Sequence, residues 1–138
     1  MRIAGLKAIA RSGSSTDVMF LAEKASILKG TEKNLARESL YTLPGEDVDN
    51  AILKAIEEAD PKIKVELIRC IGERNISSAT DLLLQLASYP DPAVRAESIE
   101  ALGKIALPAD LPDMIQLLIH SSNERERRII ETAIFLVT

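Results

Sequence analysis

Apolar residues recur along this chain with the spacing of helices rather than that of strands. Leu82, Leu83 and Leu86, for example, occupy positions i, i+1 and i+4, which lie along one side of a helix. No segment alternates apolar and polar residues with the period of two that marks a half-buried strand. Several glycines and prolines fall between the apolar stripes, where they begin or end helices; they are Gly13, Gly30, Pro44, Gly45, Pro61, Pro90, Pro92 and Pro108. We therefore predict helices near residues 1–12, 16–29, 31–43, 47–59, 62–74, 79–88, 92–106, 110–121 and 124–137.

The predicted helices are of two alternating types that repeat every 31 or 32 residues. One type carries a basic residue near its start and, six residues later, a small side chain followed by a large aliphatic one. The basic residues are Arg2, Lys33, Lys64, Arg95 and Arg127, and the small residues are Ala8, Ser39, Cys70, Ala101 and Ala133. The other type carries the apolar stripe, whose register aligns Leu21, Ile52, Leu83 and Ile115. Stacked helices need such columns, because small side chains let backbones approach and large ones fill the layer.

The two most regular copies of the repeat begin with an aspartate and a proline. Asp60-Pro61 opens one copy and Asp91-Pro92 opens the next, and Gly72 and Gly103 follow eleven residues after the prolines. A glycine inside a helix costs about 1 kcal/mol relative to alanine, which close packing of a neighbouring helix would justify. These motifs resemble the short bacterial HEAT repeat, and the resemblance extends along the whole chain. Tetratricopeptide repeats fit less well, because their period is 34 residues and their Trp and Tyr marks are missing here.

The resemblance implies an all-α fold in which two-helix repeats stack into a right-handed α-α superhelix. About four and a half repeats of this HEAT-like solenoid fit into the chain. In HEAT proteins the helix with the basic residue lines the concave side, so the helices beginning near 1, 31, 62, 92 and 124 are expected to face inward. We expect residues 1–138 to form a single HEAT-like domain that belongs to a longer array or a larger protein.

Composition and charge narrow the range of functions. Aromatic residues make up 3% of the chain, charged residues make up 28%, and the net charge is −4. A nucleic-acid-binding groove carries one sign of charge with interleaved aromatic residues, so this composition argues against a nucleic-acid partner. No segment approaches the roughly 18 consecutive apolar residues of a spanning helix, so we expect no membrane partner. Nothing in the sequence indicates a cellular compartment.

Few residues could carry out catalysis or bind a metal. Cys70 is the only cysteine and His120 the only histidine, and the repeat places them on different helices, more than one repeat apart. We expect Cys70 to be an inert packing residue and His120 to be a solvated side chain near a helix end. The acidic segment 46–50 lacks the glycine and the later glutamate of a calcium-binding loop. No catalytic residue, cofactor or metal site is therefore assigned.

Charges alternate in sign along the predicted inward face. Five residues after the basic positions come Lys7, Glu38, Arg69 and Glu100. Opposite charges on stacked helices about 8–10 Å apart can pair and hold the stack in register. Tyr41 and Phe135 share another column of that face and are candidate aromatic anchors for a partner. The candidate inward interaction surface comprises Lys7, Arg37, Glu38, Tyr41, Arg69, Glu73, Glu100, Lys104 and Phe135.

These observations favour a non-catalytic protein-interaction scaffold, whose repeated curved surface binds a protein partner of unknown identity. Two alternatives stay open. Relatives of this repeat include bilin lyases and DNA glycosylases, and an enzyme of those types would need a bilin-sized pocket or a basic concave face. A regulatory or spacer segment of a larger transporter or secreted multidomain protein would differ from a scaffold only in its neighbours.

The last predicted helix is apolar over more than one face. Its apolar residues are Ile129, Ile130, Ile134, Phe135, Leu136 and Val137. An end helix of a repeat array needs a polar outer face, because no neighbour covers it. We therefore expect an exposed apolar patch and end-to-end self-association.

Overall fold

In a computed structural model of the chain, every regular element among the described residues is helical. The structure describes residues 5, 7, 8, 13–45 and 47–138, so most of the predicted helix 1–12 lies outside the described residues. The chain divides into two compact units, Met1–Arg74 (unit 1) and Asn75–Thr138 (unit 2), which are described separately. The prediction of a single domain concerns both units together and stays a prediction.

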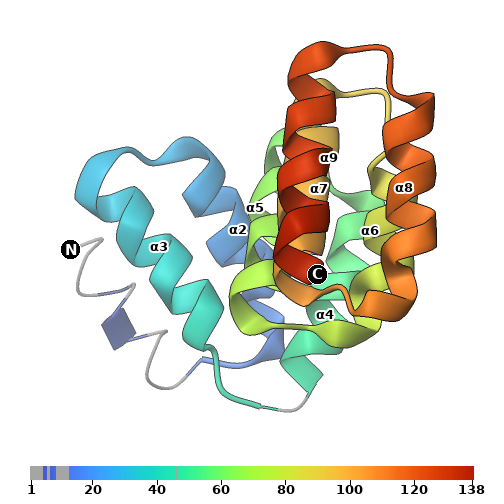
Figure 1. Cartoon of the computed structure of the whole chain (residues 1–138). Coiled ribbons are helices and arrows are strands. Elements are labelled where there is room, and N and C mark those ends of the chain that lie inside the picture. Colours follow the sequence, from blue (N-terminus) through green and yellow to red (C-terminus); the bar gives the residue numbers. More distant parts are fainter. Residues whose placement is uncertain (1–4, 6, 9–12, 46) are drawn as a thin grey trace. The chain divides into compact units, whose positions relative to one another are not determined.

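Unit 1 is organised around the helix α5. Its elements are η1 (Ser15–Asp17), α2 (Val18–Ile27), α3 (Gly30–Thr42), α4 (Asp47–Glu58) and α5 (Pro61–Arg74). α2 lies against α3, and α5 contacts α2, α3 and α4 (Figure 1). Leu21, Ile52 and Leu67 are fully buried at the centre of these contacts. The predicted alternation of two helix types therefore produces two helical layers with an aliphatic core between them.

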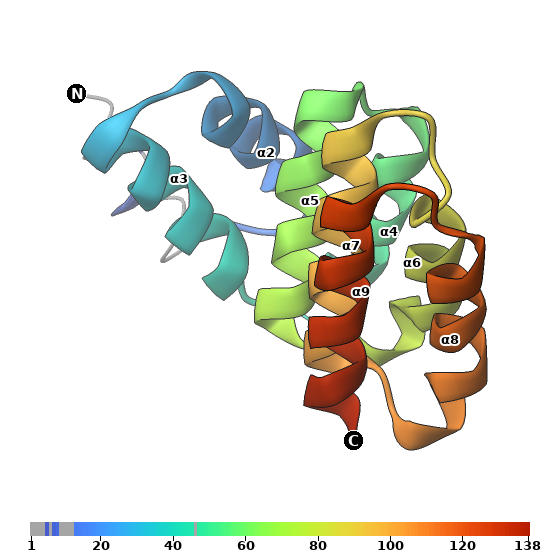
Figure 2. The same cartoon turned by 45° about the horizontal axis from the view of Figure 1, so that its top comes forward.

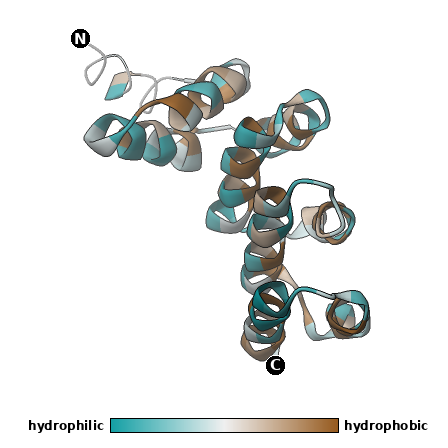
Figure 3. Cartoon of the chain, turned by 90° about the horizontal axis from the view of Figure 1, so that it is seen from above, coloured by the Kyte–Doolittle hydropathy of each residue, from teal (hydrophilic) through white to brown (hydrophobic). Residues whose placement is uncertain are grey.

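Unit 2 is organised around α7. Its elements are η2 (Ser77–Ala79), α6 (Thr80–Leu86), α7 (Pro92–Ile105), η3 (Pro108–Asp110), α8 (Leu111–His120) and α9 (Glu124–Val137). α7 packs against α6 and α9, and α8 packs against α9 (Figure 2). Leu83, Leu102 and Ile130 contribute to the core. Figure 3 shows α8 coloured as hydrophobic over much of its surface.

The Asp-Pro motifs mark helix starts. A side-chain oxygen of Asp91 accepts hydrogen bonds of 2.8 and 3.2 Å from two backbone N–H groups in the first turn of α7. Pro92 follows at the first helical position, where a missing N–H removes no hydrogen bond. Asp60 accepts a 3.0 Å hydrogen bond from the first turn of α5, and Asn123 accepts one of 3.1 Å from the first turn of α9. An aspartate or an asparagine thus caps the starts of α5, α7 and α9, whereas α3, which follows Lys29, begins without a side-chain cap.

The column of small residues lies where helices approach closely. Its members Ser39, Cys70, Ala101 and Ala133 are buried, whereas Ala8 is exposed. A Cβ atom added to Gly103 would lie 3.2 Å from the Cα atom of Ala133 and 3.3 Å from a side-chain carbon of Leu136. Gly103 therefore lets α7 and α9 come together more closely than a side chain would allow, which confirms the predicted reason for a glycine inside this helix.

The apolar stripe of α8 differs by one residue from the predicted register. The sequence pattern aligns Ile115 with the fully buried Leu83, but Met114 is 1% exposed and Ile115 is 43% exposed. Met114 is therefore the residue equivalent to Leu83, and the spacing between them is 31 residues. The additional residue of the last repeat therefore lies after Met114 and before the start of α9 at Glu124. An inserted residue before Met114 would rotate the apolar side of α8 away from the core.

Candidate interaction surface

The repeated basic residues donate to backbone oxygens at the ends of the preceding helices or, for Arg95, in the loop that follows one. Lys64 donates through its Nζ to a carbonyl oxygen in the last turn of α4. Arg95 donates to two carbonyl oxygens that follow α6, at 2.9 and 2.8 Å, and Arg127 donates to two at the end of α8, at 2.9 and 3.3 Å. The last carbonyl groups of a helix have no partner within the helix and carry partial negative charge. The periodic basic residues of these three repeats are thus structural.

Two ion pairs join equivalent helices of neighbouring repeats, one between α3 and α5 and one between α7 and α9. Arg37 on α3 donates to both carboxylate oxygens of Glu66 on α5, at 2.8 and 2.9 Å, and the Glu66 side chain is only 5% exposed. Arg95 on α7 donates to Glu126 on α9 at 2.8 Å. Salt screens the ion pairs of such partly buried, multiply bonded guanidinium groups less than it screens pairs on the surface. Arg37, which was predicted as a surface residue, therefore also holds α3 against α5.

Burial controls the titration of two side chains of unit 1. It raises the pKa of Cys70 from 9.0 to about 12, and nearby Arg74 opposes this effect. It raises the pKa of Tyr41 from 10.0 to about 12, opposed by Arg69 and Arg37. Tyr41 is half-buried, so it offers a partner less of its ring than the sequence pattern suggested. The Cys70 thiol is fully buried, and its Sγ lies 3.9 Å from the backbone oxygen of Leu40.

We expect a maleimide to label Cys70 in the native protein only as fast as the chain unfolds. The folded pKa lies above the ordinary value, so folding favours the neutral thiol. The resulting stabilisation is complete below about pH 9 and declines as the pH rises from about 9 toward 12. The labelling rate of the native protein should therefore rise above pH 9 more steeply than the rate of an accessible thiol, for which only ionisation changes. Mass spectrometry of labelling time courses, with the urea-unfolded chain as reference, measures this; rapid native labelling at pH 7 would contradict it.

A groove between α7 and α9 brings together two of the predicted surface residues. One part of the groove, of about 350 Å³, is lined by Glu100, Lys104, Ile129, Thr132, Ala133 and Leu136. The adjoining part, of about 360 Å³, shares Glu100 and Ile129 and is also lined by Arg95, Arg125 and Glu126. We call these two parts the α7–α9 groove. Its lining is mainly apolar toward the C-terminal ends of α7 and α9 and mainly charged toward their N-terminal ends.

Phe135 is the most exposed large apolar residue of unit 2, at 78%. Leu136 beside it is 63% exposed, whereas Ile130 is 2% exposed and packs in the core. The six apolar residues of α9 therefore divide between a packed stripe and an exposed one, as the sequence pattern predicted. An exposed aromatic side chain on a rigid helix is a suitable anchor for a protein contact.

The other predicted surface residues lie in unit 1. Lys7, Glu38 and Glu73 are exposed, and Arg69 is partly exposed beside Tyr41. The ion pairs described for unit 1 join Arg37 to Glu66 and Arg74 to Asp49, and none of these positions belongs to the predicted ladder of alternating charges. The ladder itself stays a prediction.

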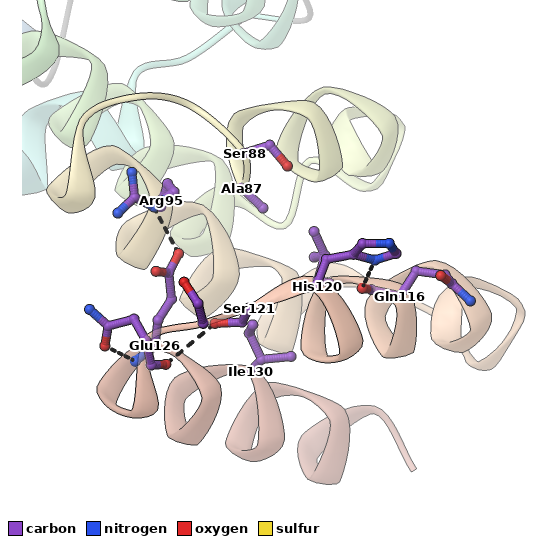
Figure 4. Close-up of a pocket in the computed structure, with 11 residues that line it drawn as sticks. Ala87, Ser88, Arg95, Gln116, His120, Ser121, Glu126 and Ile130 are labelled. Carbon is purple, nitrogen blue, oxygen red and sulfur yellow. Dashed lines mark hydrogen bonds and ion pairs between the residues drawn. The ribbon is translucent and has the colours of Figure 1, made fainter.

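A polar cavity of about 480 Å³ lies where the loops after α6 and α8 meet α7 and α9. Figure 4 shows Arg95 and Glu126 pointing toward one another across it and His120 turned toward the carbonyl oxygen of Gln116, 2.8 Å from Nδ1. Ser88 also lines the cavity. Among the described contacts no hydrogen bond joins Ser88 to His120.

The described residues also restrict other kinds of site. No group of three or more potential metal ligands occurs among them. No described helix combines the length and hydropathy needed to cross a bilayer. The apolar lining of the α7–α9 groove, in contrast, was not selected from the sequence, which named Ile129 and Leu136 among the six apolar residues of the last helix without assigning either to a groove. The sequence did carry a signal for exposed apolar surface here, because the last helix has more apolar residues than one packed stripe can bury.

The arrangement of unit 2 is that of two stacked helical hairpins with capped starts and a glycine at the closest approach. A family model for HEAT repeats matches residues 50–134, which is more than half of the chain. A comparison with curated proteins gives no match. The matched segment contains both Asp-Pro starts, Gly103 and most of α9, and its all-helical structure is that of the α-solenoid class. The chain therefore belongs to the HEAT-repeat family.

Proposed function

We propose that this protein is a non-catalytic protein-interaction scaffold that holds a segment of a partner protein in the α7–α9 groove. HEAT repeats commonly act as protein-interaction scaffolds, and this membership supports the general role. The observation that carries the specific proposal is the groove itself, in which an apolar part adjoins a charged part on two rigid helices. Apolar surface flanked by polar groups is typical of binding sites for peptide segments.

The lining of the groove defines the chemistry of the segment. Ile129, Ala133 and Leu136 offer apolar contacts to one large aliphatic or aromatic side chain. At the other end, Arg95 and Glu126 are paired with each other, whereas Arg125 is exposed. An acidic group of the partner near Arg125 would complete the match in charge. The segment we propose thus has an apolar anchor and an acidic residue.

The alternative functions have less support from the described residues. A DNA glycosylase would require a basic face, but Glu100, Lys104, Arg125 and Glu126 give the groove both signs of charge. A bilin lyase would require a pocket for a large pigment together with an acidic residue that acts on it, and no observation on the described residues assigns such a role to the groove. A spacer role in a larger protein is compatible with the same groove and depends on the neighbouring domains.

The proposal is tested by selecting binding peptides from a display library with the purified chain. Selected peptides are expected to share an apolar anchor with an acidic residue and to bind at least tenfold more weakly to Thr132→Arg, whose long side chain fills the groove. Gln85→Arg adds the same side chain at an exposed position of α6 outside the groove and should leave binding unchanged. Fluorescence titration measures both. Peptides that bind Thr132→Arg as well as the wild-type chain would overturn the groove as the site.

A further inference from the structure

The helices α8 and α9 present an outer face that the α7–α9 groove does not include. Its apolar residues are Ile115, Ile119 and Phe135, which are 43, 62 and 78% exposed, and its charged residues are Arg128 and Glu131. We call this set the α8–α9 face. Contiguous exposed apolar residues on a helical face usually mark a contact surface.

The repeat shows which way this face points. Ser88 is equivalent to Ile119 and Gly103 to Phe135, at spacings of 31 and 32 residues. Ser88 lines the cavity bounded by α8, and Gly103 lies against Ala133 of α9. Ser88, in the turn after α6, and Gly103 on α7 thus lie on the side of their repeat that faces α8 and α9. By the same geometry, Ile119 and Phe135 lie on the far side of α8 and α9.

The residues on this far side differ in kind from their equivalents. A serine is replaced by Ile119, and a glycine by Phe135. At Gly103 even a single added carbon would lie 3.2 Å from the backbone of α9. A helix therefore cannot approach α9 at Phe135 as closely as α9 approaches α7. In unit 1 the equivalent position is occupied by the half-buried Tyr41 on α3, and α5 still packs against α3, less closely than α9 packs against α7. A surface that covers the α8–α9 face must therefore accommodate the ring of Phe135.

We infer that the α8–α9 face pairs with the same face of a second copy of this chain, α8 against α8 and α9 against α9, both antiparallel. Arg128, Glu131 and Phe135 follow the spacing i, i+3, i+7 and lie on one side of α9. Antiparallel pairing about a two-fold axis near residues 129 and 130 places each Arg128 opposite Glu131 of the other copy. Parallel pairing would place like charges together.

The rest of the face agrees with this symmetry. Ile115 and Ile119 lie one turn apart on α8, so antiparallel α8 helices meet along an aliphatic seam. Phe135 then lies against the first turn of α9 of the second copy, where the stems of Glu124 and Arg128 can cover its ring. Arg128 and Glu124 are 77 and 83% exposed and paired with each other only at 3.5 Å, so they can exchange partners at little cost.

The size of the face indicates a weak dimer. Stable interfaces bury about 800 Å² on each partner, and three apolar side chains supply only part of that. We therefore expect association in the micromolar range rather than an obligate dimer. This inference is independent of the proposed peptide groove, because none of the five residues of the α8–α9 face lines it.

Sedimentation of the full chain over a range of concentrations tests the pairing. Ile119→Glu and Phe135→Glu are each expected to weaken dimerisation at least tenfold. Ile27→Glu changes an equally exposed isoleucine on α2 and should leave it unchanged. A wild-type chain that stays monomeric to millimolar concentration, or equal effects of Ile27→Glu and Ile119→Glu, would overturn the inference.

A charge exchange tests the orientation. Arg128→Glu and Glu131→Arg should each weaken dimerisation at least tenfold, because each creates two contacts between like charges. Mixing the two variants, or combining both changes in one chain, should restore association to within about threefold of wild type. If neither the mixture nor the double variant recovers, α9 does not pair antiparallel with α9. Peptide binding in the α7–α9 groove should be unchanged in all these variants, so the two proposals fail separately.

Discussion

Replacing Arg74 by methionine is expected to lower the free energy of unfolding by about 2–3 kcal/mol. The Arg74 side chain is 13% exposed and donates through Nε to Asp49 at 2.8 Å. It also donates to the backbone oxygens of Leu40, Tyr41 and Leu43 at the end of α3. Methionine keeps the packing of the stem but leaves these acceptors without their donor. Urea unfolding followed by circular dichroism measures the loss.

Two further variants separate charge from geometry at this position. Arg74→Lys keeps the charge, but a single ammonium group cannot serve Asp49 and three carbonyl groups at once, so we expect an intermediate loss. Arg128→Met removes an exposed arginine with one long ion pair and should cost about 0–0.5 kcal/mol in dilute solution. If Arg74→Met costs no more than Arg128→Met, capping by Arg74 does not stabilise unit 1.

Replacing Gly103 by leucine is expected to lower the free energy of unfolding by about 2–3 kcal/mol through overpacking of α7 against α9. The first added carbon already lies 3.2 Å from the Ala133 backbone, which cannot move without displacing α9. The remaining carbons of leucine would have to enter the same contact. Thermal and urea unfolding of the purified variant measure the effect.

The neighbouring position is a matched control for this change. Lys104→Leu places the same side chain on α7 at an exposed site and should change stability by about 0.5 kcal/mol or less. Gly103→Ala should have a small net effect, because a gain in helix propensity of about 1 kcal/mol opposes the close contact. Equal losses for Gly103→Leu and Lys104→Leu would show that α9 is not held against α7 at this point.

The local rules of helix formation made much of this fold predictable. The start of α7 follows from Asp91 and Pro92, because a cap and a fixed backbone angle act within one turn. The burial of Cys70 and Ala133 follows from their column of small residues. The predicted register of α8 was wrong by one residue. The sequence shows that the last repeat is one residue longer, but it does not show whether the added residue precedes or follows Met114. Only the burial of Met114 places it.

The candidate site was predictable only in part, because the roles of charged and aromatic residues depend on their neighbours in space. Glu100 and Lys104 line the α7–α9 groove, and their part in binding stays a prediction. Arg37 instead reaches the buried Glu66, which no spacing rule connects to it. Tyr41 and Phe135 share one column, yet the first is half-buried and the second is 78% exposed.

The sequence by itself determined the helices, their caps, the period of the repeat and the family, since these depend on residues within one or two turns and on identities that recur at a fixed spacing. The tertiary structure alone decided which charges pair, which aromatic residue stays exposed and where a groove opens. Phe135 and Gly103 occupy the same position of the repeat. Their surroundings differ because α9 covers one of them and no described helix covers the other. Side-chain burial is a property of the assembled layers, and local sequence does not contain it.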